Sequence, residues 1–266
     1  MKVRVKFAKY GALRFIGHLD VMRHFQKVIR RAGIDIAYST GFSPHQIMSF
    51  ASPLGLGMYS CGEYMDIEVH TRKDEGTHVG LPMRDPSDPD TFGDMDAAEM
   101  MRRLNAACAP GIEVLDVRLL PADAGNAMAS VAAARYTLCL KEEEEGGPAL
   151  DRDIFFERLA EAIPGFLAQD EIQVVKQTKK GSLTVDIRPG IYELWMRPDG
   201  MLEMLVDASS AGNIKPMALL GALCDYAGQP VPPFASWKVT REETYTNAGT
   251  GQERRLIPLS DVGETF

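Results

Sequence analysis

The sequence has few of the signals that identify a reaction. Only four cysteines occur in 266 residues, and no two of them form a C-x-x-C pair. A zinc or iron–sulfur site built from closely spaced thiolates is therefore not expected, and we predict no metal or cofactor in this chain. The G-x-S-x-G, H-E-x-x-H, P-loop and G-x-G-x-x-G motifs are also missing. Their absence removes the signatures of an α/β-hydrolase, a zinc protease and a nucleotide-binding enzyme.

Long apolar runs are absent too. No stretch approaches the roughly 20 apolar residues that a membrane-spanning helix needs. Residues 1–7 alternate basic and apolar side chains and lack the apolar block of a signal peptide. The cysteines have apolar neighbours, as small buried residues in a reducing compartment do, with Cys61 in a glycine-flanked loop as the least certain case. We therefore expect a cytoplasmic protein that makes no contact with a membrane.

Charge is unevenly distributed along the chain. The net charge is −8, yet residues 1–60 contain nine Lys or Arg and only two acidic residues, which makes this segment +7. The remaining residues hold 20 basic and 35 acidic side chains and carry −15. Such a division predicts that one face binds an anion while the rest of the surface keeps the protein soluble.

Apolar periodicity predicts a strand–helix–strand–strand–helix–strand order in the first half of the chain. A loop rich in Asp, Pro and Gly is expected at 71–95, and Gly33 is well placed to end the first helix. The expected strands cover 3–7, 34–38, 63–69 and 112–119, with 46–50 extended, and the expected helices cover 18–32 and 95–107.

The second half repeats this order without repeating the residues. Strands are expected at 135–140, 172–177, 183–187 and 237–244, helices at 151–163 and 215–226, and a hairpin of 191–196 and 201–206 over Arg197-Pro-Asp-Gly200. The fold class predicted is α+β, with two ferredoxin-like (split βαβ) halves and antiparallel sheets. Their predicted bounds are 1–121 and 130–247, with 248–266 as a C-terminal tail; one larger α+β domain is the alternative.

Two clusters of polar residues and glycines mark the most distinctive part of the chain. Gly17-His18-Leu-Asp20 lies where a strand meets a helix, and Tyr38-Ser39-Thr-Gly41-Phe42-Ser-Pro44-His45 follows the next strand. His18 and His45 are the candidates for acid–base catalysis, because histidine titrates near neutral pH. Asp20 could orient His24 from four residues away. The alternative interpretation makes these residues turn formers and helix caps.

The helix at 18–32 also has a basic stripe. Arg23, Lys27, Arg30 and Arg31 follow helical spacing, and Arg14 and Lys9 could extend the stripe. Such a stripe can track phosphates while nearby aromatic side chains stack on bases, although it is also what a solvated helix face presents to water. The ligand-binding candidates are therefore Arg14, His18, Asp20, Arg23, Lys27, Arg30, Tyr38, Ser39, Gly41, Phe42, Pro44 and His45.

Three blocks together resemble a known family: Leu13-Arg-Phe-Ile-Gly-His-Leu-Asp-Val-Met-Arg23, Ala37-Tyr-Ser-Thr-Gly-Phe-Ser-Pro-His45 and Glu63-Tyr-Met-Asp-Ile-Glu68. They are similar to the radical-SAM-linked proteins, which bacteria encode beside, or fused to, a B12-binding-type radical SAM protein. The resemblance implies a partnership and carries no catalytic residues. The radical SAM signature C-x-x-x-C-x-x-C is absent here. The iron–sulfur cluster, SAM and cobalamin are accordingly expected on the partner protein.

Three functions follow as hypotheses. The first is a non-catalytic module that recognises a substrate for a radical SAM enzyme and binds RNA or another anion through the basic N-terminal segment. The second is a stand-alone RNA-processing or RNA-modifying enzyme that uses a histidine as acid or base. The third is a structural subunit of a complex.

Overall fold

A computed structural model describes residues 1–70, 96–141, 151–178, 181–250 and 253–266. The chain divides into two compact units. The first contains Met1–Val131 together with Glu243–Phe266, and the second contains Ala132–Glu242. The sequence placed the boundary within 121–130 and treated 248–266 as a tail, whereas the contacts group the C-terminal segment with the first unit. The predicted loop at 71–95 lies outside the described residues.

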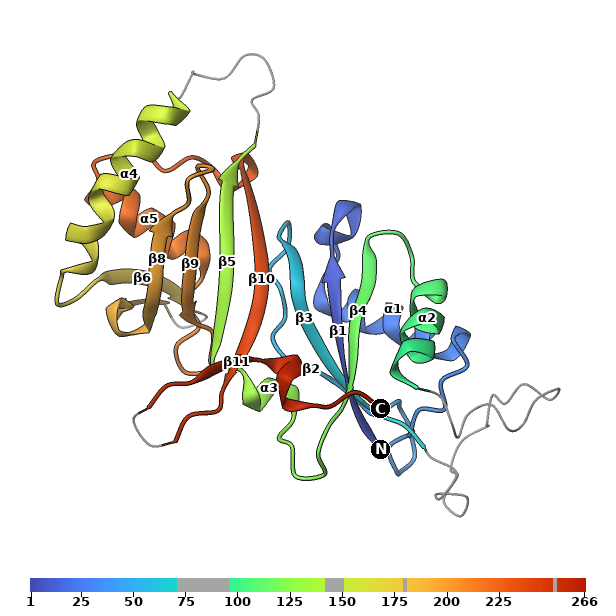
Figure 1. The fold of residues 1–266 in the computed structure, drawn as a ribbon. Helices are drawn as coiled ribbons and strands as arrows, with labels where there is room; N and C mark the ends of the chain where they lie inside the picture. Colours follow the sequence, from blue (N-terminus) through green and yellow to red (C-terminus); the bar gives the residue numbers. More distant parts are fainter. Residues whose placement is uncertain (71–95, 142–150, 179–180, 251–252) are drawn as a thin grey trace. The chain divides into compact units, whose positions relative to one another are not determined.

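The first unit is a layer of helices on an antiparallel sheet (Figure 1). β1 is central and pairs antiparallel with β3 on one side and β4 on the other, while β2 pairs antiparallel with β3. The regular elements of this unit are β1 (Lys2–Lys9), η1 (Gly11–Phe15), α1 (His18–Arg31), β2 (Met48–Phe50), β3 (Tyr59–Glu68), α2 (Ala97–Ala107), β4 (Ile112–Leu119), α3 (Ala127–Ser130), β11 (Leu256–Pro258) and η5 (Leu259–Val262).

Apolar and charged side chains alternate along β1, which makes one face of this sheet apolar. Val3, Val5 and Phe7 are buried on one face and pack with α1 and α2 into a single core. Phe25 of α1 contributes the central ring, 4.7 Å from that of Phe7 in an edge-on contact. Arg4 and the residues in step with it point to the opposite face, because side chains of a strand alternate.

The two helices of this unit begin and end at residues suited to those positions. Asp96 caps α2 by accepting a hydrogen bond from Glu99 N at 2.7 Å. Gly33 follows α1 with a φ of 66°, a left-handed conformation that favours glycine, so its predicted role as the terminator is confirmed.

The second unit has the same order of main elements. β5 pairs antiparallel with β9, β9 pairs antiparallel with β8, and β10 lies next to β5 in the sheet. β6 and β7 form a separate two-stranded sheet. The elements are β5 (Ala133–Leu140), α4 (Arg152–Leu167), β6 (Gln173–Thr178), β7 (Gly181–Asp186), η3 (Arg188–Gly190), β8 (Ile191–Met196), β9 (Leu202–Asp207), α5 (Pro216–Tyr226), η4 (Phe234–Ser236) and β10 (Trp237–Asn247).

The chain is thus an α+β protein, as predicted; its described residues form five α-helices, nine strands in the main sheet ladders and the β6–β7 pair. One predicted strand and two predicted boundaries were wrong. The segment 34–38 makes only isolated bridges, Ile36 to Val69 and Tyr38 to Gln46. β3 begins at Tyr59, four residues before the predicted start. α4 continues past residue 163, its predicted end, to Leu167. Pro164 lies in its last turn, so the backbone hydrogen bond that proline cannot donate is lost only at the end of the helix.

Candidate anion-binding surface

α1 presents its basic residues to solvent. Val21, Phe25, Val28 and Ile29 bury the opposite face of this helix in the core, which leaves Arg23, Lys27, Arg30 and Arg31 exposed. Arg23 makes an ion pair with Asp20 at 3.4 Å, and both side chains are more than half exposed. A pair this exposed is weakly held, so Arg23 remains available to a ligand.

α2 adds two arginines to the same region. Glu99 accepts from Arg102 Nε and Nη2 at 2.6 and 2.7 Å and from Arg103 Nε at 2.7 Å. These two arginines lower the pKa of the Glu99 carboxyl to about 2. One carboxylate thus holds two guanidinium groups in place and neutralises only one of their charges.

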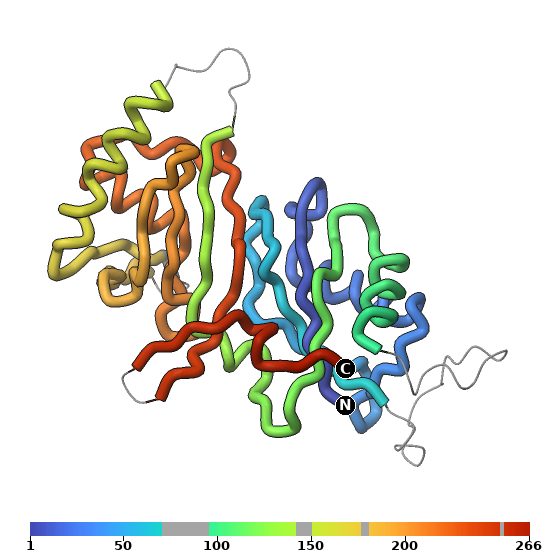
Figure 2. The backbone as a smooth tube through the Cα atoms, viewed as in Figure 1, coloured from blue at the N-terminus to red at the C-terminus, as the bar shows by residue number. Residues whose placement is uncertain are grey.

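The C-terminal end of α1 and the exposed side of α2 border an open hollow. Its volume is about 340 Å³, and its lining consists of Arg31, Ala32, Arg102, Arg103, Ala106 and Ala107. Three of these residues are alanines with small side chains, and the three arginines provide the charge. We call this the arginine hollow, and the six cationic residues Arg23, Lys27, Arg30, Arg31, Arg102 and Arg103 the basic helix surface; Figure 2 traces α1 and α2 through this part of the first unit.

Arg102 and Arg103 were not among the residues that the sequence singled out. The excess of positive charge was sought within residues 1–60, and α2 lies beyond them. The sequence did contain a signal for these two residues. Arg102 and Arg103 are adjacent in a predicted helix, and in a split βαβ order both helices cover the same face of the sheet. Only the packing of α2 beside α1 shows that the two helices share a surface.

His24 lies at the inner edge of the basic helix surface. Burial, followed by the nearby charges of Arg31 and Lys27, lowers the pKa of its imidazole. Its buried Nε2 atom has no hydrogen-bond partner among the described residues. The expected orientation of His24 by Asp20 is wrong, because the Asp20 carboxylate accepts from Arg23 instead.

His18 lies apart from that surface, at the first position of α1. Its ring packs edge-on against Phe50 at 5.1 Å. It lines a cavity of about 10 Å³ together with Lys9 and Glu63, both of which are buried. This volume is close to the lower limit for a single water molecule, so the cavity is too small for a nucleotide. His18 therefore has charged neighbours but no space for a substrate there.

The second predicted cluster forms an exposed loop at residues 39–45, which we call the Phe42 loop. Tyr38 is half-buried and bridges to Gln46 at the base of the loop. Ser39 N donates to His45 O at 2.9 Å, and Ser39 Oγ lies 2.8 Å from His45 Nδ1. Gly41 has a φ of 117°, and Gly41, Phe42, Pro44 and His45 are all exposed. None of these residues lines the cavity that contains His18.

Arg14 is stacked between two aromatic rings beside the start of α1. Its guanidinium carbon lies 4.1 Å from the Phe15 ring centre and 5.1 Å from that of Tyr59. Its Nη1 also donates to Gly11 O at 2.6 Å. These contacts hold the guanidinium in one orientation while Phe15 stays 60% exposed.

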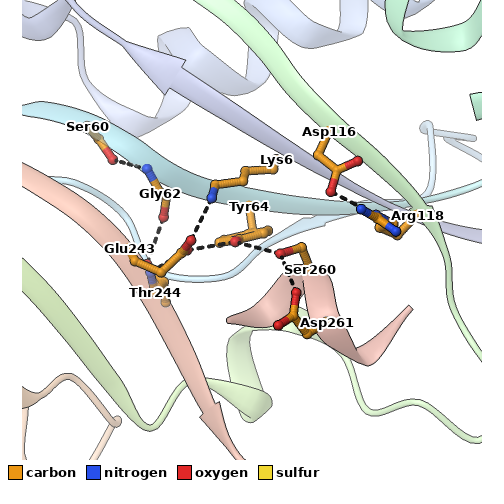
Figure 3. Close-up of polar contacts among 10 residues, drawn as sticks. All are labelled: Lys6, Ser60, Gly62, Tyr64, Asp116, Arg118, Glu243, Thr244, Ser260 and Asp261. Carbon is orange, nitrogen blue, oxygen red and sulfur yellow. Dashed lines mark hydrogen bonds and ion pairs between the residues drawn. The ribbon is translucent and has the colours of Figure 1, made fainter. Parts of the chain in front are cut away.

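The sheet face opposite α1 and α2 contains a connected polar network (Figure 3). Lys6 Nζ and Tyr64 Oη both donate to the Glu243 carboxylate, at 2.5 and 2.6 Å. Tyr64 also lies 3.4 Å from Ser260 Oγ, and Thr244 Oγ1 donates to Gly62 O at 2.7 Å. Burial and the Glu243 charge raise the pKa of the Tyr64 phenol far above its usual value. The phenol stays protonated and acts as a hydrogen-bond donor that fastens the C-terminal segment.

A buried ion pair lies on the same face. Arg4 donates from Nε and Nη2 to the two carboxylate oxygens of Asp66 at 2.7 and 3.0 Å, and the two side chains are 1% and 4% exposed. Arg4 Nη1 also donates to Leu259 O, and Asp66 Oδ2 accepts from Ala127 N. The pair therefore connects β1 and β3 to α3 and η5, which is a structural role.

The described residues contain neither a metal-binding cluster nor a membrane-spanning helix. No three side chains of His, Cys, Asp or Glu in this part of the chain come together as a metal site would require. Nor do the helices in the described ranges include one with the length and apolar character of a membrane span. The strongest candidate that remains is the basic helix surface.

The fold and this surface define an α+β protein with a cationic helical face. The chain belongs to the family described as "Uncharacterized protein conserved in bacteria (DUF2344)", which it matches over residues 2–80 and 88–216. No curated protein matches its sequence.

Proposed function

We propose that the first unit is a non-catalytic recognition module that binds the phosphate groups of RNA through the basic helix surface. The observation that supports this most directly is the arginine hollow, in which Arg31, Arg102 and Arg103 surround an open space. Arginine presents a planar fork of donors that matches phosphate oxygens, so it is favoured where phosphate is bound. The open shape suits a polymer that passes across the surface.

The charge of the two helices agrees with this proposal. α1 and α2 together contain six basic residues, Arg23, Lys27, Arg30, Arg31, Arg102 and Arg103, and two acidic residues, Asp20 and Glu99, for a net charge of +4. The whole chain carries −8. A local positive surface on an acidic protein attracts a polyanion to one place rather than to the molecule at large.

The proposal includes a partner. The resemblance to the radical-SAM-linked proteins supports recognition of a substrate on behalf of a radical SAM enzyme. That enzyme would supply the iron–sulfur cluster, SAM and cobalamin. This chain would hold the RNA, a role that requires no reactive group in the chain itself.

We also propose that both units are variants of the ferredoxin-like fold. In the first unit the order β4-β1-β3-β2 is supported by three antiparallel pairings, and two helices follow β1 and β3. In the second unit β10, β5, β9 and β8 have the corresponding order, with the β6–β7 pair inserted after α4. Such antiparallel sheets keep one face for helices and leave the other for further contacts.

Equilibrium binding of RNA at several salt concentrations tests the proposal. The full chain is titrated into a fluorescent RNA, and the variant Arg31→Glu/Arg102→Glu/Arg103→Glu is compared with it. Each phosphate contact adds about 0.7 to the slope of log K against log salt for a single strand, so losing three contacts should lower the slope by about 2. Arg158→Glu is the control for a charge reversal outside the basic helix surface, because Arg158 is an exposed arginine on α4.

The proposal fails if the unaltered protein does not bind RNA even at low salt, or if the triple variant binds with the same affinity and slope. The partnership is tested separately, by co-purifying this chain with the neighbouring radical SAM protein. Repeated recovery of each protein without the other would refute the partnership and leave RNA binding to be decided by the titration.

A further inference from the structure

The exposed phenylalanine of the Phe42 loop serves no purpose in the fold. Phe42 is fully exposed, although burying a phenylalanine side chain is worth roughly 2–3 kcal/mol. A disordered tip could expose such a residue by chance, but the base of this loop is closed by defined hydrogen bonds. Ser39 N, Ser39 Oγ and the His45 backbone and ring all take part in them. The loop therefore presents the ring to solvent on a fixed stem.

The stem of this loop adjoins the basic helix surface. Gln46, directly after the loop, donates from Nε2 to Gln26 O of α1 at 3.4 Å. Residues three and four apart on a helix are surface neighbours, so Gln26 lies between Arg23 and Arg30. The Phe42 loop thus leaves the sheet edge beside two of the exposed arginines.

A second exposed phenylalanine lies at the N-terminal end of the same helix. Phe15 ends η1, just before the Ile16-Gly17 link to α1, and the Arg14 guanidinium packs over its ring at 4.1 Å. Leu19, in the first turn of α1, is also exposed and lies four residues before Arg23. Aromatic surface therefore occurs at the start of the basic helix surface as well as beside its middle.

We infer that the basic helix surface takes single-stranded RNA, with unpaired bases stacking on Phe42 and Phe15 while the arginines contact the phosphates. This inference rests on the proposed function and specifies the class of RNA. Bases within a duplex are already stacked on one another, so they cannot cover an isolated ring, whereas unpaired bases can. A surface that offers both rings and cations suits a single strand, which presents both bases and phosphates.

The test compares three polyanions on the full chain: a single-stranded oligouridylate of about 12 nucleotides, a duplex of the same length, and inorganic polyphosphate. The length falls within the range that single-strand sites cover. Phe42→Ala should weaken binding of the single strand by about 5- to 150-fold, the range of one base–aromatic stack, and leave polyphosphate binding unchanged. Phe42→Trp should retain affinity, because tryptophan also offers a flat ring. Phe15→Ala should weaken binding of the single strand in the same way.

Phe234→Ala is the matched control, since Phe234 is an exposed phenylalanine on η4 of the second unit. If Phe42→Ala and Phe15→Ala both bind the single strand as the unaltered protein does, the inference is wrong, while RNA binding as such still stands. Tighter binding of the duplex than of the single strand would also overturn it. If Phe42→Ala and Phe15→Ala no longer bind the radical SAM partner but keep their RNA affinity, the two rings contact a protein and not RNA. Absence of binding to all three polyanions would defeat the proposed function itself.

Discussion

In the first unit the two helices that cover the sheet carry a net charge of +4, whereas α4 and α5 of the second unit carry −2. The count for α4 and α5 comes from two basic residues, Arg152 and Arg158, and four acidic residues, Asp153, Glu157, Glu161 and Asp225. Both units have the same order of main elements. The shared order requires an apolar inner face from each helix and places no demand on the outer face.

The outer faces are therefore where the two units are free to differ in function. A fold does not specify an activity, and similar scaffolds commonly carry different sites. The contrast extends to the polar face of each sheet. In the first unit Arg4 and Asp66 are buried there, while in the second unit Arg135 bridges Glu193 and Glu203 and remains partly exposed. Four predictions test how far this contrast holds.

The largest effect is expected from Asp66→Ala. It leaves the buried Arg4 guanidinium without its carboxylate, and breaking a buried pair in this way costs about 3–5 kcal/mol of unfolding free energy. Asp199→Ala in the second unit removes the partner of Arg197 from an exposed pair and should cost no more than about 1 kcal/mol. Urea denaturation of both variants measures the difference. Equal losses would mean that the burial of the first pair has no energetic consequence.

A smaller effect is expected from Tyr64→Phe. The change removes the hydroxyl that donates to Glu243, so among the described residues this partly buried carboxylate keeps only Lys6 and the Thr244 N–H as donors. A hydrogen bond to a charged group contributes about 1.5–3 kcal/mol. Thr137→Val, which removes the hydroxyl that donates to Glu242 in the second unit, is the matched comparison. An unchanged urea midpoint for Tyr64→Phe would show that the network in Figure 3 does not secure the C-terminal segment.

Single charge reversals on the helices should change RNA affinity in the first unit and leave it unchanged in the second. Arg30→Glu places a negative charge on the basic helix surface and should lower the salt slope by about 1, with weaker binding at every salt concentration. Glu161→Lys on α4 makes the acidic helix less negative and should leave the slope where it was. A gain in affinity from Glu161→Lys as large as the loss from Arg30→Glu would indicate that RNA senses only the total charge.

The smallest expected effect concerns pH. The pKa of His24 in the folded protein is below the unfolded value of about 6.5, so the unfolded chain binds the proton more readily. Above pH 6.5 the imidazole is neutral in both states and stability does not depend on it. As the pH falls from there toward the folded pKa, unfolding takes up a proton and stability declines. His24→Gln should remove this decline, and the same pH dependence in the variant would assign it to another group.

Local patterns were sufficient to predict most of the elements. The spacing of Leu19, Met22, Phe25 and Ile29 predicted α1, and Arg197-Pro-Asp-Gly200 predicted the turn in which Gly200 takes a φ of 77°. The start of β3 was missed because Cys61, next to Gly62, was expected to lie in a glycine-flanked loop, whereas it belongs to the strand. The segment 34–38 was predicted as a strand on its β-branched residues, yet only two of its residues bridge to neighbours.

The candidate surface was predicted in part. Its α1 residues follow from helical spacing, and their exposure agrees with the amphipathic pattern. Arg102 and Arg103 belong to it only because α1 and α2 pack on the same sheet face, which sequence distance does not reveal. His18 and His45 were grouped by their similar neighbours, but one lines a small cavity and the other closes an exposed loop. Residue composition cannot distinguish a shared site from two separate turns.

The position of the C-terminal segment has a consequence for synthesis. Leu259 and Ser260 contact Arg4 and Tyr64, and Glu264 pairs with Leu119, so Glu243–Phe266 completes the first unit. The ribosome synthesises this segment after the whole of the second unit. N-terminal domains usually fold first during translation. Here the first unit cannot be completed until Glu243–Phe266 has emerged, so its charged sheet face stays uncovered in a nascent chain stalled before Glu243.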